Sequence, residues 1–499
     1  MHKNYFFINC AAVAALVLFA SVGASFLRIL APHAEFEEGV ASAAVIGRAG
    51  DAAVASLPKL RVCARNRHLI EDENGKPFFV AGLCPQNMIH WCKPQQMDTY
   101  FADRQRRHFN FAWVMITGWN VSNGLDMTSP NPAENPVDAS GNGMLLKGTS
   151  WNPENLNPAY VASVDAMVRS AAAHGIYLFL DPCNSAYNPK TGNFDPANHS
   201  TDEMRQWGEF WGNRYKEYSH INFALGSDRL VSPQVDSIVT GVMKYMPDRL
   251  MTVDWIDGPP NWNCELTSPH KLYGDGHRWV NLNAWYEYRA PQWATWYHYN
   301  MTSPVMPTCI FETMYEGSTQ LGLATPSHPT SPQDMRGQEW GTVLNGGSGF
   351  GILGSFDALY DPIRWLGKNP GIEQGQYCMD FFAARHWYDL IPDWSHAFLT
   401  SQSGTPGTRD SKYVSAAITG DGTLGVCYYP GENGINFQLT VNMSKLGRGA
   451  GNSRVRWYDP TNGTYRVIGS LPNSGSHTFT TPEANSGGAA DWVLVLESK

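Results

Sequence analysis

The stretch INFALGSD at residues 221–228 decides the fold. Its apolar run ends in Gly-Ser-Asp, directly after a helix-like, aromatic-rich segment at residues 202–218. A short apolar run behind a helical pattern predicts a buried strand of a parallel sheet. Side chains at the carboxyl end of such a strand face the mouth of an α/β barrel, where barrel enzymes hold their active sites. Asp228 occupies that position.

A second apolar run, at residues 307–311, leads to Glu312 in the same way. Two carboxyl groups at two strand ends are the minimum that a glycosidase needs, because one protonates the leaving oxygen and the other attacks the anomeric carbon or activates water. We therefore expect Asp228 to be the acid/base and Glu312 the nucleophile. Taken alone, Asp228 could instead be an Asx-turn or helix-cap residue, and Glu312 a member of a buried ion pair.

Apolar runs alternate with helical patterns along most of the chain. The expected strands are at residues 78–82, 109–117, 176–181, 221–225, 250–255, 280–286, 305–311 and 349–353, and the expected helices at 96–107, 158–174, 202–218, 235–246, 291–299, 335–344 and 376–390. Eight strands alternating with helices predict a (β/α)8 TIM-type barrel, an α/β fold, over residues 58–394. Residues 60–77 look like a short hairpin lid.

The sequence pattern changes after residue 395. Short β-type runs alternate with Gly, Asn and Pro turns, at residues 413–418, 424–429, 437–441, 454–458, 478–480 and 492–496. Such a pattern predicts a small C-terminal all-β domain over residues 395–499, most simply a sandwich.

The amino terminus carries a targeting signal. Lys3 precedes a mostly apolar run at residues 5–30, with small residues at 22–24 that suit cleavage. Residues 1–30 therefore predict a secretory signal peptide, with an uncleaved membrane anchor as the alternative. Either one predicts a secreted or extracytoplasmic protein. Residues 31–57 are Ala-rich and resemble a tether.

The charge and the cysteines of the chain limit the partners, metals and cofactors that it is expected to bind. The formal net charge is -9, only 16% of residues are charged, and no long basic run occurs, so we expect no nucleic-acid partner. The eight cysteines outside residues 1–30 are compatible with disulfides in an oxidising compartment. Their spacing matches no zinc site, and no cofactor motif is present, so we expect neither a metal nor a cofactor.

Four stretches carry a resemblance to a known family. They are Gly75-Lys76-Pro77-Phe78-Phe79 with Tyr100 to Asn110, the turn Leu225-Gly226-Ser227-Asp228, the segment from Pro307 through Glu312 to Tyr315-Glu316, and the tail from Trp457-Tyr458-Asp459-Pro460 to Leu496. In this order they resemble the apiosidase-like glycoside hydrolases, barrel proteins with a C-terminal β domain labelled as collagen-binding. The resemblance implies glycosidase chemistry, with Asp228 as acid/base and Glu312 as nucleophile.

One departure concerns the sugar pocket. After the first strand the family usually has Gly-Asp-Thr-Ala-Trp, whereas this chain has Gly82-Leu83-Cys84-Pro85-Gln86. The Asp and Trp that line the family's sugar subsite are thus replaced by Leu83 and Gln86. The resemblance therefore does not name the sugar.

Other strand-end and aromatic residues are candidates for substrate contact. They are Trp119, Asp181, Asn184, Asp254, Trp255, Tyr286, Glu316 and Trp340. Each has a plainer reading, because strand-end polar residues often cap loops and tryptophans are more often core. We expect an exported glycoside hydrolase that acts on a polysaccharide or its side chains, by a retaining mechanism or, at wider carboxyl spacing, an inverting one. The rival is a non-catalytic carbohydrate- or matrix-binding surface protein on the same fold.

Overall fold

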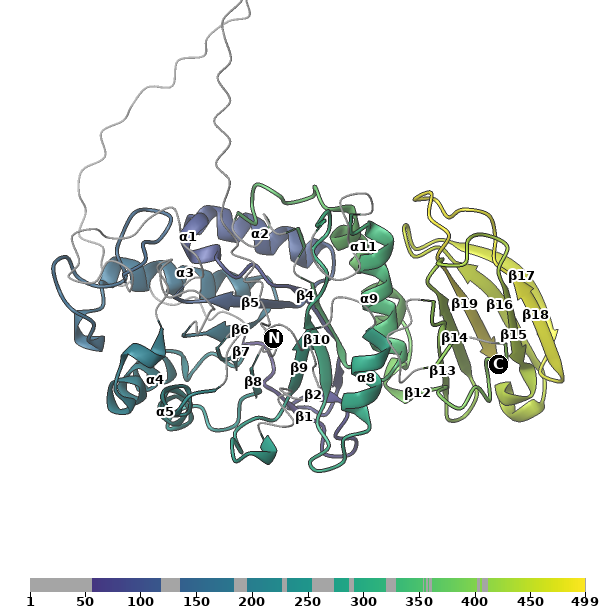
Figure 1. The fold of residues 1–499 in the computed structure, drawn as a ribbon, viewed down its shortest axis with the longest axis horizontal. Helices are drawn as coiled ribbons and strands as arrows, with labels where there is room; N and C mark the ends of the chain where they lie inside the picture. The colour runs from purple at the N-terminus through teal and green to yellow at the C-terminus, as the bar shows by residue number, and fades with distance from the viewer. Residues whose placement is uncertain are drawn as a thin grey trace, which may run out of the picture. The chain divides into compact units, whose positions relative to one another are not determined.

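A computed structural model describes residues 56–117, 135–183, 195–226, 231–253, 273–286, 291–319, 329–352, 354–355, 358, 361–401, 404–405 and 412–498. All of them belong to one compact unit, Ala53–Lys499. Figure 1 shows an α/β part, followed along the chain by a β domain. Among the helices in these ranges, none has the length and apolar character needed to cross a bilayer.

The α/β part is built on eight parallel strands. They are β4 (Val80–Leu83), β5 (Phe111–Met115), β6 (Tyr177–Asp181), β7 (Ile221–Ala224), β8 (Met251–Thr252), β9 (Asn283–Tyr286), β10 (Thr308–Glu312) and β11 (Gly349–Ile352). Their order is β8-β7-β6-β5-β4-β11-β10-β9, which is the cyclic order of a barrel. Between β8 and β9, the amide of Asn281 donates to the carbonyl of Met251 at 3.1 Å. The (β/α)8 prediction is confirmed.

Helices alternate with these strands and cover the outside of the sheet. They are α1 (Met88–Trp91), α2 (Pro94–Arg106), α3 (Pro158–Ala173), α4 (Thr201–Tyr215), α5 (Pro233–Met243), α8 (Pro291–Tyr299), α9 (Pro332–Leu344) and α11 (Pro370–Ala383). The sequence starts several of them with recognisable signals. Ser200 and Ser331 cap α4 and α9, each within a capping box, and Pro occupies the first turn of most of the others.

Aromatic side chains fill the interior of the barrel. The rings of Phe111, Phe179 and Phe311 contact one another, with centroid separations of 4.8 to 5.2 Å. They belong to a buried cluster that also contains Trp113 and Tyr315. The barrel is therefore a packed core, and chemistry is confined to its ends.

A small antiparallel sheet closes the amino ends of the barrel strands. It consists of β1 (Leu60–Val62), β2 (Ile70–Asp72) and β3 (Pro77–Phe78). Tyr177, at the start of β6, donates its hydroxyl to the carbonyl of Pro58 at 2.7 Å, and Ser348, just before β11, donates to the carbonyl of His68 at 2.6 Å. The segment expected to be a lid thus covers the end opposite the mouth, and Leu60 joins the interior cluster.

The C-terminal domain contains two antiparallel sheets. One has the order β12-β13-β14-β19-β16-β17 and the other pairs β15 with β18. Their bounds are β12 (Leu390–Pro392), β13 (Ser415–Thr419), β14 (Leu424–Tyr429), β15 (Gln438–Asn442), β16 (Asn452–Tyr458), β17 (Tyr465–Pro472), β18 (Ser476–Thr480) and β19 (Trp492–Ser498). The all-β prediction is confirmed, although the sequence pattern predicted neither β12 nor β17.

Two strands of the larger sheet are covered on both faces. Val426 and Tyr428 of β14 join the core shared with the helices, whereas Cys427 and Tyr429 join the core inside the β domain. The same alternation divides β19. This double burial explains why both strands are apolar at nearly every position, a pattern more usual in parallel sheets.

A buried ion pair joins the barrel to the β domain. Arg336 of α9 donates through Nε and Nη2 to the two carboxylate oxygens of Asp491, at 2.8 and 2.6 Å. Both side chains are at most 2% exposed, and the hydroxyl of Tyr428 also donates to Asp491 at 3.2 Å. Beside this pair, Trp340 stacks on Tyr428 at an interplanar angle of 8°.

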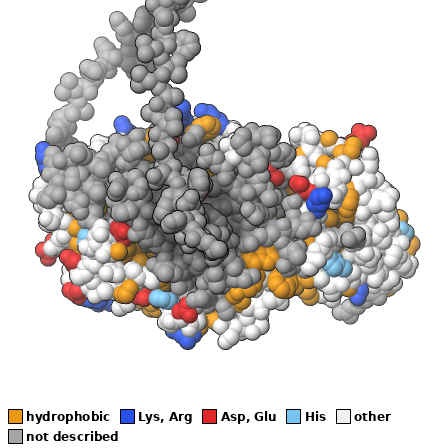
Figure 2. Space-filling model, in the orientation of Figure 1, with side chains coloured by type: hydrophobic (Ala, Val, Ile, Leu, Met, Phe, Trp, Pro, Cys, Tyr) orange, Lys and Arg blue, Asp and Glu red, His pale blue; other side chains and the backbone are white. Residues whose placement is uncertain are grey.

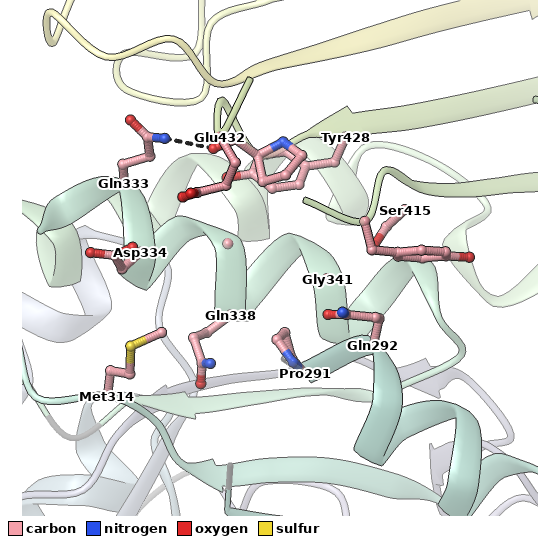
Figure 3. A pocket seen from close by; sticks show the side chains of 13 residues that line it. Pro291, Gln292, Met314, Gln333, Asp334, Gln338, Gly341, Ser415, Tyr428 and Glu432 are labelled. Carbon is pink, nitrogen blue, oxygen red and sulfur yellow. Dashed lines mark hydrogen bonds between the residues drawn. The ribbon is translucent and has the colours of Figure 1, made fainter. Parts of the chain in front are cut away.

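A groove runs along this junction between α9 and the β domain (Figure 3). Gln333 donates its amide to the carbonyl of Pro430 across it at 2.6 Å. The side-chain amide of Gln338 lines the groove and has no protein partner in the described part of the chain. The cavity volume of about 40 Å³ holds only a few waters and is far below the ~150 Å³ that accommodates benzene. This volume is too small to enclose a sugar ring.

No disulfide joins the cysteines that the structure describes, although the sequence is compatible with such bonds. Seven cysteines lie in the described ranges, and all seven are buried: Cys63, Cys84, Cys92, Cys183, Cys309, Cys378 and Cys427. Cys84 is typical, because its Sγ donates to the carbonyl of Phe311 at 3.0 Å inside the barrel. These thiols behave as small apolar core residues.

Loss of the junction ion pair should destabilise the protein strongly. Arg336→Met leaves the Asp491 carboxylate buried without its cation, so we expect the free energy of unfolding to fall by about 3–5 kcal/mol. Arg205→Met is the matched control, because Arg205 pairs with the exposed Asp202 at 2.6 Å on α4 and should cost at most about 1 kcal/mol. Urea denaturation measures both, and equal losses would contradict this account.

Candidate active site

Glu312 is the last residue of β10 and lies at the carboxyl end of the sheet. Simple alternation would place it on the same face as Ile310, but the pairing of β10 with β9 shifts register between these two residues. Bulges of this kind reorient side chains at strand ends. The carboxylate accepts a hydrogen bond from the hydroxyl of Tyr315 at 2.8 Å, and Tyr315 belongs to the cluster that fills the barrel. Glu312 is 7% exposed.

Glu316, four residues later, binds the start of a helix. Its Oε1 accepts from the amide of Gly371 at 3.0 Å, and its Oε2 from the amide of Ile372 at 3.3 Å. Burial raises the pKa of Glu316, and these two amides partly offset that rise. The carboxylate that was predicted to contact substrate is thus hydrogen-bonded to the first turn of α11.

Asp181 ends β6 and is completely buried. Its Oδ1 accepts from the amides of Cys183 at 3.1 Å and Gly226 at 3.3 Å, whereas Oδ2 has no partner in the described residues. Burial raises the pKa of this carboxyl well above its usual value. Gly226 follows β7 with φ +73°, a left-handed conformation that favours glycine just before Ser227-Asp228. Asp181 thus ties the end of the third barrel strand to the end of the fourth.

Several predicted site residues lie outside the described residues. They are Asp228, Trp119, Asn184, Asp254 and Trp255. Tyr286 is placed by its backbone, opposite Glu312 in the ladder between β9 and β10. Of the expected catalytic pair, the described structure contains Glu312.

The prediction that Trp340 is a stacking platform needs correction. Its side chain is 0% exposed, enclosed by Tyr428 of the β domain and Phe381 and Phe382 of α11. No ring face is left for a sugar, so Trp340 packs the junction between the two domains.

The end of the first barrel strand differs chemically from the family pattern. Leu83 belongs to the outer apolar cluster, and Cys84 points into the barrel interior, where it contacts Phe311. Gln86 is 5% exposed, and its carbonyl accepts from the amide of Met115 at 3.0 Å. The residues that replace the family's Asp and Trp are therefore built into the core.

Sequence reasoning missed Tyr315 as a site residue. It is three positions after Glu312 in a turn, so its contact depends on how the chain bends after β10. The available signal was the neighbouring pair Tyr315-Glu316 that follows the strand. Within the described ranges, His, Cys, Asp and Glu side chains nowhere gather in a group of three that could hold a metal ion.

In Figure 2 the acidic and basic side chains of the described residues are scattered, and Lys and Arg form no continuous patch among the described residues on the face shown.

Comparison with protein families gives two matches. Residues 64–388 match the family described as "Apiosidase-like, catalytic domain". Residues 406–497 match the family described as "Putative collagen-binding domain of a collagenase". A comparison with curated proteins gives no match.

Solved structures share the fold over nearly the whole chain. A glycoside hydrolase family 5 protein from Bacteroides vulgatus superposes with a TM-score of 0.71 at 18% identity, covering 88% of this chain and 93% of that one. A second structure, titled glycoside hydrolase, has a TM-score of 0.70 at 18% identity and covers 89% of this chain and 97% of that one. At this identity the likeness establishes the architecture of both parts of the chain.

Asp181→Asn should change how stability depends on pH. The native carboxyl has a raised pKa, so the native state binds more protons than the unfolded state above about pH 4, and wild-type stability declines as pH rises. The Asn variant keeps an oxygen that accepts from the same amides and removes this titration. We therefore expect the free energy of unfolding of the variant, relative to wild type, to increase from pH 4 to pH 8. Urea denaturation measures both proteins at each pH. If the free energy of unfolding of the variant relative to wild type stays constant or falls over this range, Asp181 is not held protonated.

Proposed function

Since this chain belongs to the apiosidase-like family of glycoside hydrolases, we propose that it is exported and hydrolyses O-glycosidic bonds by a retaining, two-carboxylate mechanism. The proposal rests on the position of Glu312 at the carboxyl end of the seventh barrel strand, where its carboxylate accepts a hydrogen bond from the hydroxyl of Tyr315. Asp228 follows the fourth strand in the chain and is the proposed partner. Export draws on the apolar run at residues 5–30.

The proposed reaction has two steps. In the first, the carboxylate of Glu312 attacks the anomeric carbon while the carboxyl of Asp228 protonates the departing oxygen, giving a glycosyl ester of Glu312 and a free alcohol. In the second, Asp228 removes a proton from water, which attacks the same carbon and releases Glu312 as a carboxylate. The Tyr315 hydroxyl supports this assignment, because a hydrogen bond to a carboxylate favours its ionised form.

The proposed substrate class is a plant-type or microbial polysaccharide or its side chains. The family pattern does not identify the sugar here, because Leu83 and Gln86 stand where the Asp and Trp of the sugar subsite are usual. Both are nearly buried, so neither can take over the recognition of hydroxyl groups without movement of the chain.

The replacement of the family's Asp and Trp by Leu83 and Gln86 favours one alternative, a non-catalytic carbohydrate-binding protein. A protein that has lost its sugar-recognising Asp and Trp but kept the barrel could bind carbohydrate without cleaving it. Binding to polysaccharide without any release of reducing sugar would identify this alternative.

Removal of either proposed carboxyl should abolish hydrolysis. We expect Glu312→Gln and Asp228→Asn each to lower turnover by about 10²–10⁴-fold or more, since each removes one half of the reaction. Glu154→Gln, at an exposed position, is the control and should be fully active. Release of reducing sugar from a panel of plant and microbial polysaccharides measures the rates, and full activity in Glu312→Gln would refute the assignment.

The stereochemical outcome tests the mechanism separately. Proton NMR of the first product formed should show the anomer of the substrate, as a retaining enzyme requires. An initial product of opposite configuration would establish inversion and make Glu312 the base that activates water.

A further inference from the structure

We propose that Tyr315 and Glu316 are positioning residues for Glu312: Tyr315 holds its carboxylate directly, and Glu316 fixes the turn that carries Tyr315 by binding the first turn of α11. This inference rests on the proposed role of Glu312 as nucleophile and adds how the chain holds that group in place.

The first step is the contact between Tyr315 and Glu312. The phenol oxygen lies 2.8 Å from Oε1 of Glu312, and both side chains are 7% exposed. A hydrogen bond to a carboxylate that is shielded from water is stronger than one between neutral groups. It restricts the rotation of the carboxylate and favours its charged form, which are the two requirements of a nucleophilic carboxylate.

The second step is the unusual start of α11. The residue before this helix, Asn369, makes no side-chain cap, although the first amides of a helix need acceptors. Pro370 has no amide hydrogen, and the amides of Gly371 and Ile372 donate to Glu316. The next amide, of Glu373, donates to the carbonyl of Asn369 at 3.0 Å. Glu316 therefore supplies the cap that the local sequence lacks.

The third step is that this cap anchors the turn after β10. The amide of Glu316 donates to the carbonyl of Gly354, just after β11, at 3.0 Å, and the amide of Gly317 donates to Thr330 at 2.8 Å. Both the side chain and the backbone of Glu316 are thus fixed to neighbouring segments. Because Tyr315 directly precedes Glu316, its hydroxyl is presented to Glu312 from a turn with little freedom.

The anchor is closely packed around Gly371. A methyl group on Gly371 would lie 2.8 Å from Cγ and 2.9 Å from Cβ of Met335 and 3.0 Å from Oε2 of Glu316, so a larger residue would force Met335 and the carboxylate to shift. Negative charge at a helix start is also stabilised by the helix dipole. The charged neighbours of Glu316 oppose each other, since Glu373 raises its pKa and Arg336 lowers it.

The test is the titration of Glu312 itself, which needs no substrate. Protein labelled with carboxyl-¹³C glutamate is titrated by NMR, and the signal of Glu312 is identified by its loss in Glu312→Gln. We expect Tyr315→Phe to raise the pKa of Glu312 by about one pH unit, the worth of one hydrogen bond to a charged group. Tyr215→Phe is the matched control, because Tyr215 donates to Asp165 at 3.0 Å between two outer helices, and it should leave Glu312 unchanged.

A double-mutant cycle tests whether Glu316 acts through Tyr315. Glu316→Gln keeps one acceptor for the two amides, so we expect a smaller rise in the pKa of Glu312. We expect no further rise when it is combined with Tyr315→Phe. Gly371→Ala, which crowds both Met335 and the Glu316 carboxylate, should act like Glu316→Gln and serves if that variant fails to fold.

Two results would overturn the proposal. An unchanged pKa of Glu312 in Tyr315→Phe would show that Tyr315 does not hold the carboxylate. Additive pKa shifts in the double variant would show that Glu316 does not act through Tyr315. Neither result depends on hydrolysis, so failure here leaves the proposed reaction standing. Conversely, a catalytically silent protein would still show the predicted titration.

Discussion

Parallel pairing of eight strands is the constraint on which the rest of this molecule depends. It brings every carboxyl end of a strand to one edge, and it turns scattered strand-end residues such as Asp181 and Glu312 into neighbours of a single mouth. The interior is filled with aromatic rings, and a small sheet covers the opposite end. Chemistry is therefore confined to the mouth by packing as well as by topology.

The β domain is part of the same packed structure. Its larger sheet uses one face to cover α9 and α11 and the other to build its own core. The buried Arg336–Asp491 pair needs both partners, because either charge alone would be costly in this environment. Glu316 binds the first turn of α11, which is one of the helices that this sheet covers.

The sequence was most informative where one local pattern determines structure. The apolar runs predicted all eight barrel strands, because each run is buried on both faces. The edge strand β17 was missed because most of its residues are exposed and its sequence lacks that apolar signal. Trp340 was a candidate for substrate contact because aromatic rings suit sugars, but it lies within α9, and its complete burial beside Tyr428 shows that it is core. Tyr315 and the capping role of Glu316 depend on chain bending and on a helix more than fifty residues away, which no local pattern encodes.

A retaining mechanism requires that Glu312 form a covalent bond to the sugar. Incubation with a 2-deoxy-2-fluoro glycosyl fluoride of the sugar that the enzyme releases, followed by mass spectrometry of the digested protein, tests this most directly. We expect one added fluoroglycosyl group on the peptide that contains Glu312, and none in Glu312→Gln. A label on another carboxylate, or its persistence in that variant, would contradict the assignment.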